Sequence, residues 1–294
     1  MVADPHIDWH LFSTLTLNGL SLAALYFIVA SGFSVSFGLM RVVNMAYGSL
    51  YLLGAYVGYE AGALSSNWGL ALMAGVVTAA ALGALLQIGF FGWMQGQELR
   101  QALVAIGASI VLADLMLARW GGATYQIDVP AVLSSFTTLP LVGRYPSARL
   151  GVIAIAVALC AVLWLTLERT RLGSLVRAGV DDRAMLEATG VNVALLSVGM
   201  AALAGALAGG AGVIGGTVLS ISPGEDARYL LSSLMVVIVG GMGSLLGTAM
   251  GALLIGLAET YGLAYAPTYS TVFTFAIMVA VLAVRPRGLV GAAP

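Results

Sequence analysis

The sequence predicts an all-α polytopic membrane protein with about eight or nine transmembrane helices, including broken or re-entrant segments, and three features carry that prediction. Hydrophobic residues make up 60% of the 294 residues, and charged residues only 9%. Soluble domains carry about 25% charged residues, so this composition excludes a soluble protein. The apolar residues form long runs, and glycines repeat within those runs at helical spacing. The chain is therefore expected to be a bundle of membrane helices.

The individual spans follow from the length of the apolar runs, since a membrane helix needs about 20 mainly apolar residues. Two shorter runs, 45–62 and 229–241, are richer in glycine and other small residues. Each of these is a full span, a broken helix or a re-entrant segment, because irregular backbone at membrane depth is tolerated only inside protein or beside a cavity. The clear spans are 11–37, 69–94, 101–119, 150–167, 194–218, 245–265 and 269–284.

All twelve basic residues are arginines, and their distribution predicts the orientation through the positive-inside rule. An external N-terminus and alternating spans put eight inside the cell: Arg41, Arg100, Arg169, Arg171, Arg177, Arg183, Arg285 and Arg287. The same choice puts four outside: Arg119, Arg144, Arg149 and Arg228. We therefore expect a periplasmic N-terminus, a cytoplasmic C-terminus, and an external loop at about 120–149 with a short structured piece. The N-terminus has no basic residues, so the first span is expected to remain uncleaved.

Glycines at a spacing of four lie on one helix face and allow backbones to approach closely in lipid. They do so at 54, 58 and 62, at 205 and 209, and at 243, 247 and 251. The stretch GGMGSLLGTAMGALLIG (240–256) is denser than packing alone requires. Because Gly240, Gly241 and Gly243 disfavour a regular helix, a break between two half-helices is expected there.

Two carboxylates fall inside apolar runs, where an ionised group is costly. Asp114 precedes Arg119 and is expected to pair with it, and Glu259 is expected to bond to a neighbouring helix near the membrane surface. A secondary transporter driven by an ion gradient, or a channel, would instead need several such carboxylates facing one cavity. That class is the alternative to the function developed below.

The sequence gives no support for nucleic-acid binding, ATP binding, metal binding or catalysis by this chain. A net charge of −1 argues against nucleic acid as a partner. Because the chain has no lysine, it has no Walker-type phosphate loop, so any ATP is bound by another subunit. His6 and His10 have no further partners for a metal site, and Cys160 lies alone in an apolar run. We expect no enzyme activity, no metal and no cofactor in this chain.

One short segment, about 168–193, concentrates the charge. Eight of the 25 charged residues fall between Glu168 and Asn192, together with the apolar Met185 and Leu186. The segment divides into two short helices, with Asp181 or Asp182 able to cap the second and Gly190 suited to end it. A solvated loop would account for the arginines alone, whereas mixed charge around two apolar residues indicates docking to a protein.

This segment resembles the cytoplasmic coupling loop of the permease subunits of branched-chain amino-acid ABC importers. The family pattern, T-R-x-G-x-x-x-R-A-x-x-x-D ending in G-[IV]-N, is matched by Thr170, Arg171, Gly173, Arg177, Ala178, Asp182, Gly190, Val191 and Asn192. Three other stretches resemble the family in the expected order: GLMRVVNMAYGSLYLLGAYV (38–57), GGMGSLLGTAMGALLIGLAE (240–259) and the closing RPRGLVG. One departure concerns the substrate: Tyr47 and Ser49 stand where the family commonly has His and Glu around the glycine.

The resemblance implies a single permease domain over 1–294, in a bacterial inner membrane. Its expected partners are a second related permease in a heterodimer, two ATPases that carry ATP and Mg²⁺, an external binding protein, and the lipid bilayer. The residues expected to couple to the ATPase are Arg171, Gly173, Arg177, Asp181, Asp182, Met185, Leu186, Glu187 and Gly190. Those expected to border the translocation path are Asn44, Tyr47, Gly48, Ser49, Gly240, Gly241, Gly243, Ser244, Gly247 and Glu259.

Overall fold

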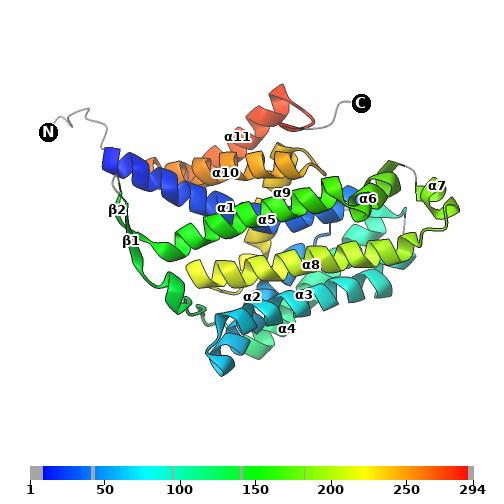
Figure 1. Ribbon diagram of the computed structural model, residues 1–294, viewed down its shortest axis with the longest axis horizontal. Coiled ribbons are helices and arrows are strands. Elements are labelled where there is room, and N and C mark those ends of the chain that lie inside the picture. Colours follow the sequence, from blue (N-terminus) through cyan, green and yellow to red (C-terminus); the bar gives the residue numbers. More distant parts are fainter. Residues whose placement is uncertain (1–8, 41–43, 95, 140–141, 182, 291–294) are drawn as a thin grey trace.

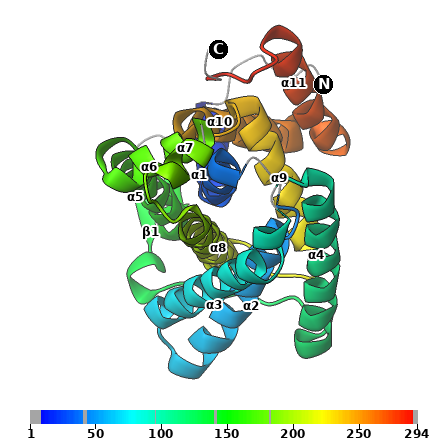
Figure 2. The same ribbon diagram turned by 90° about the vertical axis from the view of Figure 1, so that its right-hand side faces the viewer.

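The chain forms a helix bundle in a computed structural model, which describes residues 9–40, 44–94, 96–139, 142–181 and 183–290. Figure 1 shows several of the long helices roughly horizontal, and Figure 2 shows the bundle turned by 90°, with several of these helices nearly end-on and others running across the view. The α-helices are α1 (Trp9–Met40), α2 (Tyr47–Ser65), α3 (Trp68–Gly89), α4 (Glu98–Trp120), α5 (Ser147–Arg169), α6 (Arg171–Asp181), α7 (Arg183–Ala188), α8 (Val193–Val218), α9 (Glu225–Gly240), α10 (Leu245–Tyr265) and α11 (Ser270–Val284).

Within the described residues, seven helices are long and apolar enough to cross a membrane: α1, α3, α4, α5, α8, α10 and α11. These correspond to the seven spans predicted from the sequence. The two shorter runs form α2 and α9, which are each continuous helices. Asn67, Asn192 and Ser244 begin α3, α8 and α10, and each accepts a hydrogen bond from a first-turn N–H. These side chains satisfy N–H groups that a helix start leaves unpaired.

The expected external loop contains the structured piece that the sequence predicted. Strands β1 (Phe136–Leu139) and β2 (Gly143–Pro146) form an antiparallel hairpin that leads directly into α5. The connection also holds the short 3₁₀ helix η2 (Ala131–Leu133). Two further 3₁₀ turns, η1 (Phe91–Trp93) and η3 (Pro267–Tyr269), follow α3 and precede α11. Figure 1 shows the hairpin at one end of the bundle, with α6 and α7 at the other.

Helices α1 and α8 occupy the centre, and α4, α5 and α11 the periphery (Figure 2). In the most apolar stretch of α1, 83% of the residues are buried, against 17% in α4 and 11% in α11. The exposed side chains on α4 are mostly aliphatic, among them Leu103, Ile110 and Leu115. Such surfaces suit lipid or another membrane subunit rather than water.

Close helix contact at glycine holds the centre together. A Cβ atom added at Gly209 of α8 would overlap the carbonyl oxygen of Gly75 on α3, and one at Gly54 of α2 would overlap the Gly209 backbone. Gly212, one turn further along α8, meets the Tyr51 carbonyl oxygen in the same way. The repeated spacing in the sequence is therefore the line along which α2, α3 and α8 pack.

Gly209→Ala is expected to destabilise the bundle by about 1–3 kcal/mol, because the new methyl group has no space beside the α3 backbone. Gly199→Ala, also in α8, is the matched control: nothing lies within 4 Å of its added Cβ. There the better helix propensity of alanine should leave stability unchanged or raised by up to about 1 kcal/mol. Thermal unfolding of the detergent-purified protein measures both, and equal melting temperatures for the two variants would contradict this packing.

Candidate functional site

The segment expected to couple to an ATPase forms two short helices, α6 and α7, at the end of the bundle away from the β-hairpin (Figure 1). The inner face of α6 is anchored by Val176, which is buried with Val35 of α1 and Met200 of α8. Arg171 and Leu172 of α6 are exposed. The segment is thus attached to two central helices while one of its faces remains open.

Gly173 and Arg177 hold α6 against the end of α5. A Cβ atom at Gly173 would overlap the Leu167 carbonyl oxygen, so only glycine allows this crossing. The Arg177 guanidinium donates to the same carbonyl at 2.5 Å and lies 3.7 Å from the Glu168 carboxylate. Arginine here therefore binds a carbonyl that the end of α5 leaves without a helical partner.

The apolar pair on α7 divides between surface and interior. Met185 is 68% exposed, whereas Leu186 is only 6% exposed and is packed within this chain. Both residues were expected to couple to the ATPase, but Leu186 is already buried within this chain and is not available for that contact. Glu187 is exposed, and Gly190 ends the segment with φ +85°, the left-handed conformation that its glycine predicted. Asp182 lies outside the described residues, and the Asp181 side chain is likewise not described.

Four of the residues expected to border a translocation path lie where α2 begins. The Asn44 side chain accepts from the Ala46 N–H at 3.0 Å. Tyr47 is fully buried, packs edge-on against Phe33, and donates its hydroxyl to the Val29 carbonyl at 2.6 Å. Gly48 touches the first turn of α9, and Ser49 is buried between α2 and α4 with a hydrogen bond to the Ser109 carbonyl. All four residues are therefore in contact with other residues of this chain.

The glycine-rich stretch at 240–247 forms a tight turn between α9 and α10. Gly241 and Gly243 take φ +110° and +82°, and α10 starts after Ser244, which accepts from the Gly247 N–H at 3.0 Å. Helices α9 and α10 leave this turn in different directions (Figure 1), with the backbones of Gly240 and Gly247 in contact. The expected interruption is present, as a tight turn between two helices.

The closing RPRGLVG stretch covers this turn. The N–H groups of Leu289 and Val290 donate to the carbonyls of Val239 and Gly240, at 2.9 and 3.1 Å. Gly288 has φ +83°, and a Cβ atom there would lie 2.5 Å from the Gly241 nitrogen. The C-terminal stretch therefore supplies donors to carbonyls at the end of α9.

The structure brings some of the predicted ATPase-coupling residues next to some of the predicted translocation-path residues, and it places the other path residues elsewhere. A cavity of about 550 Å³ is lined by Gly173 and Arg177 of α6 and by Gly243 and Ser244 of the turn. Gly48, in contrast, meets α9 at its first turn, about 20 Å along that helix from Gly240. The predicted path residues at the start of α2 are thus separated from those in the glycine turn.

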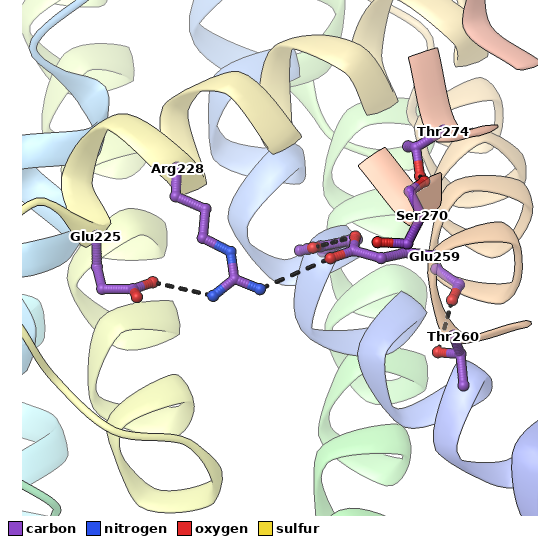
Figure 3. Close-up of polar contacts among 8 residues, drawn as sticks. Glu225, Arg228, Glu259, Thr260, Ser270 and Thr274 are labelled. Atoms are coloured by element: carbon purple, nitrogen blue, oxygen red, sulfur yellow. Dashed lines mark hydrogen bonds and ion pairs between the residues drawn. The ribbon is translucent and has the colours of Figure 1, made fainter. Parts of the chain in front are cut away.

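Glu259 lies far from the glycine turn, in a polar cluster of its own (Figure 3). Its Oε2 accepts from the Tyr26 hydroxyl of α1 at 2.5 Å, as expected for a carboxylate bonded to a neighbouring helix. Its Oε1 lies 3.6 Å from the guanidinium of Arg228 on α9, which is also 3.5 Å from Glu225. Sequence reasoning missed Tyr26 and Arg228; the only available signal was the placement of Glu225 and Arg228 on one face at a spacing of three.

The expected pair of Asp114 and Arg119 is not what the structure shows. Arg119 pairs with Glu60 of α2, with 2.5 Å between Nη2 and Oε1. Residues five apart on a helix point in directions about 140° different, so Asp114 and Arg119 do not share a face. Asp114 is exposed on the outer side of α4.

Known transport proteins resemble this chain over nearly its whole length. A family model described as the permease component of the branched-chain amino acid transport system matches residues 15–282. The chain belongs to this family of transport permeases. It is 28% identical over 294 residues to the high-affinity branched-chain amino acid permease BraD of Pseudomonas aeruginosa, covering 94% of each chain. Its identity to the corresponding LivH permease of Escherichia coli is 28% over 290 residues, 93% of this chain and 94% of that one.

The fold also has a counterpart among solved structures. The PsaBC complex of Streptococcus pneumoniae with a Fab contains a chain that superposes with a TM-score of 0.53, at 12% identity, over 92% of this chain and 91% of that one. At this identity the likeness concerns the fold alone.

As a member of the transport permease family, the chain is a multi-pass membrane subunit of an ABC transporter and not an enzyme. Family membership implies no cofactor on the permease itself. It also implies an ATPase and a substrate-binding protein as partners.

For this permease, Tyr47→Phe is expected to cost about 0.5–1.5 kcal/mol, since it removes only the hydrogen bond to Val29. Tyr47→Ala should cost about 3–5 kcal/mol, because it leaves a cavity in a packed interior. Tyr265→Phe serves as control, as Tyr265 is 70% exposed. Melting temperatures of the three purified variants test the order. A stable Tyr47→Ala variant with altered transport would favour a path-lining role instead.

Proposed function

We propose that the permease forms one half of the membrane path of an ATP-driven importer for branched-chain amino acids or closely related small solutes. The observation that carries this proposal is the family match over residues 15–282. The near full-length relatives from Pseudomonas and Escherichia coli, both named as branched-chain amino acid permeases, support the substrate class.

The partners proposed are a second, related permease, two cytoplasmic ATPases with ATP and Mg²⁺, and an external binding protein. The exposed face of α4 carries Asp114 among aliphatic side chains, and a carboxylate is costly against lipid. A neighbouring permease that covers this face would shield it. The binding protein would deliver solute at the end that carries the β-hairpin.

The α6–α7 segment is proposed to receive the movement of the ATPase. Among its described side chains, the large apolar ones that are exposed are Leu172 and Met185, at 63% and 68% exposure. Its inner side is held by Val176 against α1 and α8 and by Gly173 and Arg177 against α5. A push on the exposed face would therefore move three membrane helices at their ends.

The orientation proposed places α6 and α7 in the cytoplasm and the β-hairpin in the periplasm of an inner membrane. Arg169 ends α5 where it meets α6, and Arg171 and Arg177 are on α6, whereas Arg144 is on β2 and Arg149 is in the first turn of α5, at the other end of the bundle (Figure 1). The positive-inside rule favours the cytoplasm for the end with more arginines. The C-terminus is then cytoplasmic and the N-terminus periplasmic.

An ion-driven transporter is less well supported. Its carboxylates would share a cavity, whereas Asp114 faces outward from α4 and Glu259 is held by Tyr26 and Arg228. The two groups lie on different helices, and of the two cavities at the ends of the bundle, Glu259 lines one and Asp114 lines neither.

A cysteine at Ser174, in a Cys160→Ala background, is expected to react with a membrane-impermeant thiol reagent only from the cytoplasmic side. Ser174 is exposed on α6. Ser134→Cys, exposed beside the β-hairpin, is the control and should react only from the periplasm. Labelling intact cells and inverted vesicles in parallel checks both, and the reverse pattern would overturn the orientation.

Met185→Ser is expected to weaken binding of the ATPase about tenfold or more, because burial of an apolar side chain of this size contributes about 1.5–3 kcal/mol. Glu187→Gln should have a smaller effect, since exposed charges contribute about 0–1 kcal/mol. The measurement is ATP-dependent uptake of leucine into proteoliposomes that contain both permeases, the ATPases and the binding protein, together with the ATPase affinity.

Uptake that requires ATP and survives collapse of ion gradients supports the importer. Uptake driven by an ion gradient without ATP would refute it. Wild-type ATPase affinity and uptake in Met185→Ser would refute docking through α7.

A further inference from the structure

A second cavity, of about 490 Å³, lies at the end of the bundle that carries the β-hairpin. Its walls come from α1, α5, α8, α9 and α10, so it is formed within a single permease chain. Sites for small molecules commonly have volumes of about 300–1,000 Å³. This cavity includes Glu259 and is separate from the one beside α6.

The charged side chains that line it balance each other. They are two arginines, Arg149 and Arg228, and two glutamates, Glu225 and Glu259. A cation alone or an anion alone would be repelled by one pair as it is attracted by the other. A molecule that carries both charges can satisfy both pairs.

The arrangement leaves Arg228 able to bind a ligand. Its guanidinium lies between Glu225 and Glu259 in Figure 3, at 3.5 and 3.6 Å. Charge-assisted hydrogen bonds are usually about 2.7–2.9 Å, so these contacts are loose. The Arg228 side chain is 54% exposed, whereas those of Glu225 and Glu259 are 22% and 18% exposed.

Hydrogen bonds with neighbouring side chains orient the other charged groups of the cavity. Tyr26 fixes one oxygen of Glu259, which leaves Oε1 directed toward Arg228. Asn18 accepts from the Arg149 guanidinium and from the Tyr145 hydroxyl. Burial raises the pKa of the Tyr145 phenol, against the opposing effect of Arg149, so Tyr145 acts as a neutral donor. The site is therefore oriented before any ligand enters.

The rest of the wall is largely aliphatic. Leu22 and Leu25 of α1 face the cavity together with side chains of α5, α8 and α10, namely Val152, Val218 and Leu263. An aliphatic group of a ligand would be removed from water here, which favours binding.

We infer that this cavity recognises a small zwitterion with an aliphatic tail, of the α-amino-acid class. The ligand carboxylate binds Arg228 and Arg149, the ammonium group binds Glu225 and Glu259, and the tail lies on the leucine and valine wall. This inference rests on the proposed import function and deepens it, because it gives the permease its own recognition site near the side of entry.

A zwitterionic lipid headgroup has the same pair of charges, so the experiment must separate the two sources. The importer, with both permeases and the ATPases, is placed in nanodiscs of phosphatidylglycerol, which offer no zwitterionic headgroup. Binding of L-leucine is measured by calorimetry without ATP and without the binding protein. Isovalerate carries only the carboxylate and isoamylamine only the ammonium, and both keep the aliphatic tail.

Leucine is expected to bind at least about tenfold more tightly than either analogue, since each lacks one charge-assisted contact. Glu259→Gln should weaken leucine binding about tenfold or more. Glu60→Gln is the matched control, because Glu60 also pairs with an arginine but does not line the cavity, and it should bind leucine as the wild type does. Addition of phosphatidylethanolamine should leave the affinity for leucine unchanged.

Several outcomes would overturn the inference. These are absence of leucine binding, equal binding of isovalerate or isoamylamine, wild-type binding in Glu259→Gln, and displacement of leucine by phosphatidylethanolamine, which would assign the cavity to lipid. The proposed function is tested separately by ATP-driven uptake. If the importer transports leucine without binding it at this cavity, the proposed function stands and the proposed site is wrong. If leucine binds at the cavity but ATP-driven uptake is absent, the site stands and the proposed function is wrong.

Discussion

The backbone contact of α8 with α2 and α3 is the constraint on which the rest of the structure depends. Gly209 allows α8 to touch Gly75 of α3 and Gly54 of α2 at one point. Apolar side chains gain little from leaving lipid for a protein interior, so association in a membrane depends on such close approach. Once these helices are fixed, α2 begins beside Val29 of α1 and beside the first turn of α9. Gly48 of α2 contacts the backbone of Asp226 on α9, two residues before Arg228.

Two groups of polar side chains lie at the two ends of the bundle. At one end, Arg177 and Gly173 attach α6 beside the glycine turn of α9 and α10. At the other, Arg228 lies among Tyr26, Glu225 and Glu259. Charged groups at depth in a membrane protein need such partners, because ionised side chains in lipid are costly. These paired charges thus lie at the ends of the bundle, where a solute or another subunit can reach them.

Local patterns in the sequence predict most of the fold. Length and hydropathy predict the seven spans, and the spacing of glycines predicts the faces on which α2, α3 and α8 pack. Gly190 and the charged segment around it predict two short helices. These features could be predicted because each depends on residues close together in the chain.

The site could be predicted only in part, because its contacts join residues that are far apart. The pairing of Arg119 with Glu60 and not with Asp114 depends on how α2 and α4 meet. Leu186 looks like a surface anchor in the sequence, yet the direction of α7 buries it. Tyr26 reads as one apolar-run residue among many until α1 brings it to Glu259, more than two hundred residues later. Side chains such as these take their roles from helix packing, which short-range patterns do not contain.

The two ends are connected by continuous helices, and this bears on how a permease of this kind can be driven. Helix α1 contributes Leu22, Leu25 and Tyr26 to the zwitterion cavity and its support, and Val35 to the contact with α6. These contacts are about 14 Å apart along one helix, counted from Tyr26 to Val35. A shift of α6 that moved α1 relative to α10, through the contact of Val176 with Val35, would change the distance between Tyr26 and α10. Because Tyr26 holds Glu259, the same shift alters the carboxylate that would bind the ammonium group. By linkage, a ligand that prefers one position of Glu259 must also favour one position of α6.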